Sequence, residues 1–233
     1  MKILSLDSSA QVATVALCED ERLLAEYTLN NGNTHSETLL PMVESVLASY
    51  GITTDEIGLF ACTSGPGSFT GVRIGAATVK GLAFGRSVPC VGVSTPEAIA
   101  ENLTLHRGLI CPVMSARRGQ VYTALFRSDG ERLVRLMEDT PLSVAELDEL
   151  LSAYGEPVAF AGDGYEVTLA ALKKTVALPV PERLRHQSAY SVAQVALRAY
   201  REGRADTDAS LKVNYLRPSQ AERTRMEAEQ KNS

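Results

Sequence analysis

Alternating apolar and polar positions at the start of the chain predict three short strands. The strands cover Ile3–Asp7, Val12–Cys18 and Arg22–Leu29, and the first two would form a hairpin around Ser8–Gln11. Apolar residues then recur every three or four positions over Ser36–Tyr50, which predicts a helix with one apolar stripe. The chain therefore begins as a strand meander that leads into an amphipathic helix.

A glycine-rich turn links the next predicted strand to the next predicted helix. Ile57–Thr63 is an apolar run typical of a buried strand. The glycine-rich stretch SGPGSFTGVRIG (Ser64–Gly75) follows it and leads into a predicted helix over Phe69–Phe84. A strand over Val88–Val93 and a helix over Thr95–Leu103 follow. This alternation of strands and helices indicates an α/β fold.

The second half of the chain repeats the order of the first half. Strands are predicted at Leu109–Ser115, Gln120–Arg127 and Pro157–Ala161, with helices over Ser143–Leu151 and Ser188–Glu202. The last of these strands runs into AGDG, as the strand before SGPG does in the first half. We therefore predict two related α/β lobes, 1–104 and 105–218, followed by a flexible tail at 219–233.

The glycine stretch fits none of three common binding or catalytic motifs. It lacks the G-K-[ST] ending of a Walker loop, and Ser68 directly follows Gly67, which excludes the G-x-S-x-G nucleophile elbow. A dinucleotide loop would need its third glycine one residue before Gly71, and an acidic residue where the chain has Ser94 and Thr95. Glycine inside a helix costs about 1 kcal/mol relative to alanine, so we interpret these glycines as points of close approach by another segment.

The apolar residues of the second helix surround its axis instead of forming one stripe. They are Val72, Ile74, Ala77, Val79, Leu82 and Phe84. A helix that is apolar on all sides is covered on all sides, and its own sheet covers only one of them. The pattern leaves two interpretations open: a helix deep in the core of one chain, and a helix that docks on another protein.

Composition and charge exclude several classes of protein. The net charge of −5 argues against a strong nucleic-acid surface, and no apolar run approaches the ~18 residues of a membrane span. The chain starts without the pattern of a secretory signal, so we expect a cytoplasmic protein. The four cysteines lack C-x-x-C spacing and the three histidines lack H-x-x-x-H spacing, so we expect reduced thiols and no metal site.

Several motifs together resemble the TsaB (YeaZ) family. They are ILSLDSS at 3–9, HSETLLP at 35–41, GPGSFTGVRIG at 65–75, ARRGQVY at 116–122, AGDG at 161–164 and YLRPS at 215–219. That family is the bacterial accessory subunit in the synthesis of threonylcarbamoyladenosine, a modified nucleoside beside the tRNA anticodon. The resemblance implies the two-lobed fold of actin, sugar kinases and Hsp70 (ASKHA). It also implies a homodimer when alone, a heterodimer with the catalytic paralogue TsaD, the ATPase TsaE as a further partner, and tRNA contact through the complex.

From the resemblance we expect the first two helices to pair with the same two helices of TsaD. The expected interface residues are Leu39, Leu40, Val43, Val46, Leu47, Phe69, Val72, Arg73, Ala76 and Val79. Because an unpaired charge would be buried in that interface, we expect Leu39→Arg or Val72→Arg to abolish the heterodimer and to leave the chain folded.

In this fold class, phosphates and their metal sit at the first hairpin turn. The candidates here are Asp7, Ser8 and Ser9, with Asp163 from the second lobe, and the alternative is that both aspartates only satisfy turn backbone. The second-lobe position equivalent to Asp7 is Ser115, where the family commonly has aspartate, so a carboxylate that could hold a metal-bound phosphate is missing. We expect no cofactor bound tightly by this chain alone, and leave ATP or ADP with magnesium open for the complex.

These features lead to one functional hypothesis and one rival. We interpret the chain as a non-catalytic subunit that docks on TsaD for threonylcarbamoyl transfer to tRNA adenosine. Arg117 and Arg118 are candidates for a tRNA phosphate contact, with a solvated hairpin turn as the alternative. The rival is an independent enzyme of the same fold, a small-metabolite kinase or a glycoprotease-like hydrolase. A kinase would need a phosphate site in both lobes, and a hydrolase would need a nucleophile–base pair or a metal cluster.

Overall fold

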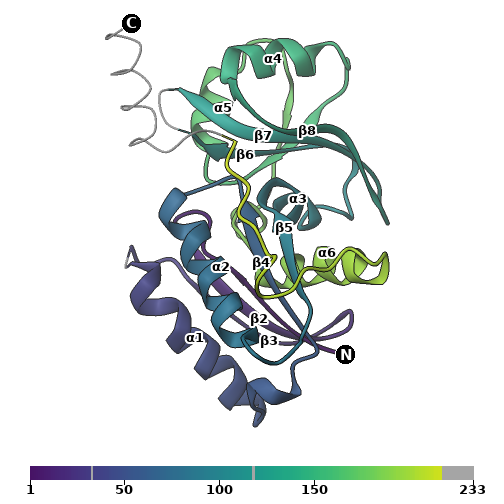
Figure 1. Cartoon of the computed structure of the whole chain (residues 1–233). Helices are drawn as coiled ribbons and strands as arrows, with labels where there is room; N and C mark the ends of the chain where they lie inside the picture. Colours follow the sequence, from purple (N-terminus) through teal and green to yellow (C-terminus); the bar gives the residue numbers. More distant parts are fainter. Residues whose placement is uncertain (33, 117–118, 217–233) are drawn as a thin grey trace, which may run out of the picture.

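The strands of the first sheet form where alternating and continuous apolar runs predict them. β1, β2 and β3 make an antiparallel meander, and β4 and β5 extend the sheet parallel to β1, in the order β3-β2-β1-β4-β5. Their bounds are β1 Lys2–Asp7, β2 Ala13–Glu19, β3 Arg22–Leu29, β4 Leu59–Gly65 and β5 Cys90–Ser94. The computed structural model describes residues 1–32, 34–116 and 119–216, and Figure 1 shows them as two lobes, one above the other.

The second sheet repeats the strand order of the first. β6, β7 and β8 make an antiparallel meander, and β9 and β10 continue it parallel to β6, in the order β10-β9-β6-β7-β8. Its bounds are β6 Arg107–Ser115, β7 Gln120–Asp129, β8 Leu133–Ser143, β9 Val158–Ala161 and β10 Ala177–Leu178. Counted from the outer meander strand, the two sheets have the same topology, which confirms the predicted duplication of an α/β unit.

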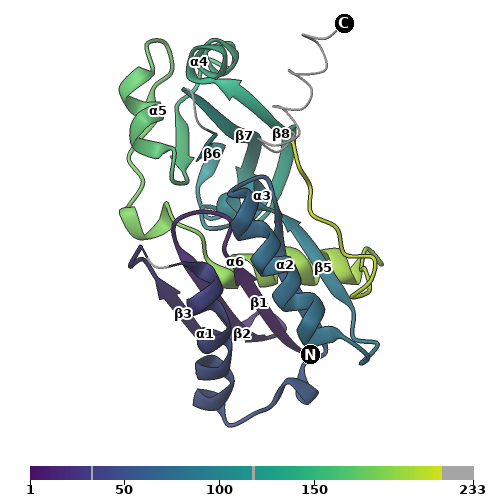
Figure 2. The ribbon, with the colours of Figure 1, turned by 60° about the vertical axis from the view of Figure 1, so that its left-hand side comes forward.

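Helices cover both faces of the first sheet and separate the two sheets. α1 and α2 pack on one face, where Figure 2 shows them side by side, and α6 packs on the other face. α3 lies between the sheets and contacts β6 and α6, whereas α4 and α5 belong to the second lobe. The bounds are α1 His35–Tyr50, α2 Phe69–Ala83, α3 Thr95–Glu101, α4 Val144–Ser152, α5 Tyr165–Ala171 and α6 Ala189–Arg201, with 3-10 turns η1 Thr54–Glu56 and η2 Glu182–Leu184.

The last helix returns to the first lobe, although chain order places it in the range 105–218. Ala189, Val192 and Ala196 of α6 are buried in one cluster with Ile3 of β1. In addition, Ser5 Oγ donates a hydrogen bond to Ala189 O at 2.6 Å. The face of the first sheet opposite α1 and α2 is apolar, so this helix lies there because that face would otherwise contact water.

α2 buries one side and exposes the other. Val72, Ala76 and Val79 lie in the core, whereas Ala77 and Phe84 face outward, and Phe84 is 78% exposed. The first sheet thus covers one side of the helix, as its apolar composition predicts.

Candidate functional site

The glycine stretch of α2 packs against the β1–β2 turn at backbone distance. Ser68 N donates a hydrogen bond to Ser9 O at 2.6 Å, and Ser8 Oγ donates to Gly71 O at 2.9 Å. A Cβ atom on Gly67 would lie 2.5 Å from Ser9 O, and one on Gly71 would overlap Ser8 O. Glycine is therefore required here because the helix and the turn meet without room for side chains.

Asp7 is fully buried beneath this turn. Its Oδ1 accepts hydrogen bonds from Ser9 N at 2.7 Å and from Thr63 Oγ1 at 2.9 Å, whereas Oδ2 has no partner among the described residues. Burial raises the pKa of the Asp7 carboxyl, because lost hydration penalises the charged form more than the hydrogen bonds favour it. The geometry is that of an aspartate that closes a turn.

The β1–β2 turn is closely packed against the start of α2. Ser8 and Ser9 are buried, and two amides at the start of α2 are already bonded, Ser68 N to Ser9 O and Gly71 N to Ser68 Oγ. The free oxygen of Asp7 is shielded from solvent, so it does not present a ligand to a magnesium ion. In the structure Asp7 and Ser8 bond to the backbone of the turn and of α2, as in the alternative interpretation, and nucleotide binding at this turn stays a prediction.

Asp163 closes a turn in the second lobe. Its Oδ1 accepts a hydrogen bond from Ser115 N at 2.9 Å, which ties the AGDG turn to the end of β6. Gly164 N donates to Val113 O at 3.0 Å, and a Cβ atom on Gly162 would overlap the same carbonyl. Each lobe therefore has a glycine turn pressed against neighbouring backbone. The hydrogen bonds of Asp163 and Asp7 stay within their own lobes.

Most of the predicted interface residues lie in the core of this chain. The buried ones are Leu39, Val43, Val46, Leu47, Val72, Ala76 and Val79. Only Leu40, Phe69 and Arg73 of the predicted set reach the surface. We correct the predicted interface accordingly, because the three-four stripe that identifies a helix consists of the side chains that face its own sheet.

The exposed residues of the two helices define a separate surface. We call it the α1–α2 outer face, and its residues are Glu37, Leu40 and Glu44 of α1 with Arg73, Ala77 and Phe84 at α2, together with the half-buried Phe69. The predicted set missed Ala77 and Phe84, although both continue from Arg73 at helical spacing. Removing the buried stripe from the helix pattern would have identified them.

His35 and the four cysteines have structural roles or buried positions among the described residues. His35 Nε2 lies 2.6 Å from Ala10 O and so braces the β1–β2 turn. All four cysteines are free and buried, and burial raises the pKa of Cys18 to about 12. Within the described ranges, no three His, Cys, Asp or Glu side chains are grouped as metal ligands. Arg117 and Arg118 lie outside the described residues.

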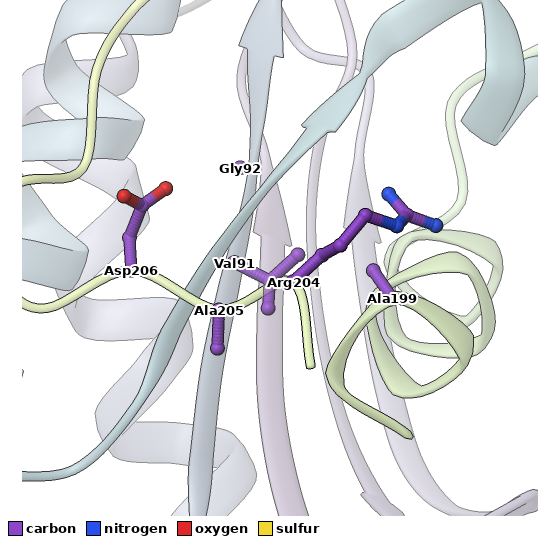
Figure 3. Close-up of a pocket in the computed structure, with 6 residues that line it drawn as sticks. All are labelled: Val91, Gly92, Ala199, Arg204, Ala205 and Asp206. Atoms are coloured by element: carbon purple, nitrogen blue, oxygen red, sulfur yellow. The ribbon is translucent and has the colours of Figure 1, made fainter. Parts of the chain in front are cut away.

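A pocket of about 310 Å³ opens between β5 and the chain that follows α6. It is lined by Val91, Gly92, Ala199, Arg204, Ala205 and Asp206. Figure 3 shows the Arg204 and Asp206 side chains pointing apart, and each has a partner, Glu202 for Arg204 and Ser210 for Asp206. The pocket therefore lacks the convergent polar groups of a ligand site. In the part of the chain described, every helix is too short or too polar to cross a bilayer.

The matching family model and the relatives described next all carry names from tRNA threonylcarbamoyladenosine synthesis. Residues 22–230 match the family model described as TsaD, tRNA N6-adenosine threonylcarbamoyltransferase. A Bacillus subtilis protein named tRNA threonylcarbamoyladenosine biosynthesis protein TsaB is 35% identical over 162 residues, 70% of this chain and 71% of the relative. The Escherichia coli protein of that name is 37% identical over 55% of this chain and 56% of its own length. A Geobacter tRNA N6-adenosine threonylcarbamoyltransferase is 29% identical over 56% of this chain and 43% of its own length.

Solved structures show the same relationship at the level of the fold. A Pseudomonas aeruginosa protein described as similar to the peptidase YEAZ has a TM-score of 0.81 and 26% identity, covering 93% of this chain and 99% of that one. The activator of a Clostridium difficile 2-hydroxyisocaproyl-CoA dehydratase, solved with bound ADPNP, has a TM-score of 0.50 and 11% identity, covering 92% of this chain and 100% of that one. The two-lobed, actin-like fold implied by the motifs is confirmed.

Proposed function

Because this chain belongs to the TsaB family of tRNA threonylcarbamoyladenosine biosynthesis proteins, we propose that it docks on the catalytic paralogue TsaD and leaves the transfer chemistry to that subunit. The reaction served is threonylcarbamoyl transfer to the tRNA adenosine beside the anticodon. The ATPase TsaE and the tRNA join the assembly in the cytoplasm, and the chain forms a homodimer when alone.

The closed β1–β2 turn is the observation that carries this proposal. Ser8 and Ser9 are packed under the start of α2, and Asp7 below them is fully buried. An independent kinase of this fold would need that turn open to phosphate. A chain whose own backbone fills the turn is better suited to binding a protein than to turning over a nucleotide.

The α1–α2 outer face supports the docking part of the proposal. Leu40 is 48% exposed and Phe84 78% exposed, and they belong to adjacent helices on one face of the first sheet. A single exposed apolar residue needs no explanation, whereas large apolar side chains exposed at two adjacent helices suggest a partner. A homologous partner has equivalent helices, so the two surfaces can pair about a pseudo-two-fold axis. A stable complex of this kind buries about 800 Å² on each side.

The decisive experiment compares the chain alone, TsaD alone and the mixture. Each is incubated with TsaE, ATP, magnesium, the activated threonylcarbamoyl donor and unmodified tRNA, and the modified nucleoside is measured by mass spectrometry. We expect product only when both paralogues are present, and a complex of the two on gel filtration. Calorimetric titration of the isolated chain with ATP and magnesium should give no turnover. Nucleoside modification or steady ATP hydrolysis by the isolated chain would contradict the proposal and favour the rival enzyme.

A further inference from the structure

An arginine that contacts two aromatic rings lies in the first turns of α2. The guanidinium carbon of Arg73 is 3.8 Å from the centre of the Phe69 ring and 5.2 Å from the centre of the Tyr215 ring. The centres of the two rings are 4.9 Å apart, and Arg73 Nε donates a hydrogen bond to the Tyr215 hydroxyl. Arg73 is exposed, yet these contacts hold its side chain in one orientation.

Tyr215 reaches this cluster because the chain after α6 crosses back over the first lobe. We call residues 206–216 the C-terminal strap. Asp206 pairs with the first residue of β5, Leu211 is buried in the core beneath α2, and Asn214 N donates to Ser64 O at 2.7 Å. Figure 1 shows the strap rising beside α2 towards the N-terminal end of the helix. The strap is thus attached to β5, to the core and to β4 before the chain reaches Tyr215.

Arg73 is oriented but has no acidic partner in the described ranges. Arg86 pairs with Asp55, and Arg198 pairs with Glu101. Across residues 1–32, 34–116 and 119–216, by contrast, no carboxylate oxygen lies within 4.0 Å of the Arg73 guanidinium. A guanidinium has five N–H donors and Nε supplies only one, so the donors of the two terminal nitrogens remain for a partner.

We propose that Arg73 is the anchor of the α1–α2 outer face and pairs with a carboxylate of the catalytic subunit. This inference rests on the docking function proposed above. The planar guanidinium matches a carboxylate through two parallel hydrogen bonds. Phe69 and Tyr215 already restrict its motion, so less side-chain entropy is lost on binding. Arginine and tyrosine are also the residues that most often dominate interface energetics.

The surrounding charges favour a protein carboxylate over an RNA phosphate. The outer face that carries Arg73 also exposes Glu37 and Glu44, and the ammonium of Lys80 is directed to Ala209 O. RNA backbones are bound by clusters of cations, and the net charge of the whole chain is −5. One oriented guanidinium on a chain of net negative charge fits one carboxylate.

The test measures the affinity of the full chain for TsaD by calorimetry. Arg73→Ala should weaken binding ~30-fold, the scale of an interface hot spot. Arg73→Lys should weaken it by roughly 10-fold, because it keeps the charge and loses the planar fork. Tyr215→Ala should weaken it by roughly 5-fold, because Arg73 then loses its orientation. Thermal unfolding of each variant checks that the fold is retained.

A charge-matched control and a reciprocal variant sharpen the test. Arg132 is exposed in the β7–β8 turn of the second lobe, so Arg132→Glu changes the net charge as Arg73→Glu does. Arg132→Glu should bind TsaD within roughly 2-fold of the wild type, as expected for a charge outside the interface. Arg73→Glu should lose binding and regain it when one acid on the first two helices of TsaD is changed to arginine.

Three results overturn the inference. If Arg73→Ala binds TsaD as tightly as the wild type, Arg73 is no anchor, and the docking function stands without it. If Arg73→Ala binds TsaD normally but the complex binds tRNA more weakly, Arg73 contacts phosphate instead. If the wild-type chain itself fails to bind TsaD, the docking function fails and the anchor fails with it.

Discussion

Gly71 meets Ser8 so closely that a Cβ atom on Gly71 would overlap the Ser8 carbonyl oxygen. The contact joins the start of α2 to the β1–β2 turn, and the hydrogen bond from Ser8 Oγ to Gly71 O reinforces it. Alanine has a higher helix propensity than glycine, but an alanine side chain at position 71 would not fit against Ser8. The contact therefore explains why α2 contains glycine there. The same contact packs α2 onto the turn that holds the predicted phosphate residues Ser8 and Ser9.

Gly71→Ala should therefore destabilise the protein, by about 1–3 kcal/mol as overpacking of a close contact does. Gly81 provides the matched control, because it lies in the same helix and a Cβ atom there would meet nothing within 4 Å. Gly81→Ala should stabilise the protein by about 0.5–1 kcal/mol through helix propensity. Urea denaturation measures both changes. Equal effects of the two substitutions would show that the turn is not packed as described.

Leu39 and Leu40 are adjacent in α1, but substitution by arginine should affect the stability of the fold at Leu39 and binding to TsaD at Leu40. Leu39 is 1% exposed, so Leu39→Arg should destabilise the fold by about 3 kcal/mol or more through an unpaired buried charge. Leu40 is exposed, so Leu40→Arg should change the free energy of unfolding by less than about 0.5 kcal/mol and should weaken binding to TsaD. Urea denaturation followed by gel filtration with TsaD distinguishes the two. A Leu39→Arg variant as stable as the wild type would reverse the assignment of the faces. Val72→Arg should behave like Leu39→Arg.

Burial of Asp7 should make the stability depend on pH. Because the pKa of Asp7 is raised in the folded protein above its ordinary value of 3.8, the folded state holds the proton more tightly than the unfolded state. The stabilisation from the neutral carboxyl is complete below 3.8 and is lost as the pH rises through the folded pKa. Asp7→Asn is neutral at every pH and should lack this loss.

The free energy of unfolding of the wild type and of Asp7→Asn is measured in urea at a series of pH values from 4 upward, on the order of one unit apart. The difference in stability, Asp7→Asn minus wild type, should grow with rising pH. A difference that stays constant would mean that Asp7 keeps its ordinary pKa in the folded protein.

Arg135 links the two lobes and should contribute to the stability of both. Its guanidinium donates to Asp139 Oδ1 at 2.7 Å within β8 and to Glu97 Oε2 at 2.9 Å across to α3, and Ser94 Oγ donates to Asp139 Oδ2 at 2.7 Å. The Asp139 side chain is only 10% exposed, so Arg135→Met leaves a largely buried carboxylate without its cation. We expect a loss of about 3 kcal/mol.

The control for Arg135 is a surface pair between the same residue types. Arg201 binds Glu21 with both side chains more than half exposed, so Arg201→Met should cost at most about 1 kcal/mol. Thermal and urea denaturation of both variants provide the comparison. Similar losses in the two variants would mean that the position of Arg135 between the lobes is energetically unimportant.

The sequence by itself determined the elements and their repetition. Strand and helix periods depend on which side chains avoid water locally, so alternation at the first hairpin and three-four spacing in Ser36–Tyr50 were sufficient to predict β1, β2 and α1. The repeated order of strands, helices and glycine turns likewise predicted two sheets of one topology. The cost of glycine within a helix pointed to a close approach near Gly71, without naming the segment that approaches.

Only the tertiary structure decided which segments meet and which faces remain exposed. Arg73 and Tyr215 are separated by 142 positions, and no local pattern joins them. The apolar stripe of α1 marks the side chains that leave water, and the sequence does not tell whether its own sheet or a partner receives them. Likewise, Asp7 is buried because the start of α2 packs on the β1–β2 turn, and α6 returns because one face of the first sheet is apolar. The physical reason is that periodicity reports the environment of one element, whereas a site is made by contacts between elements distant in the chain.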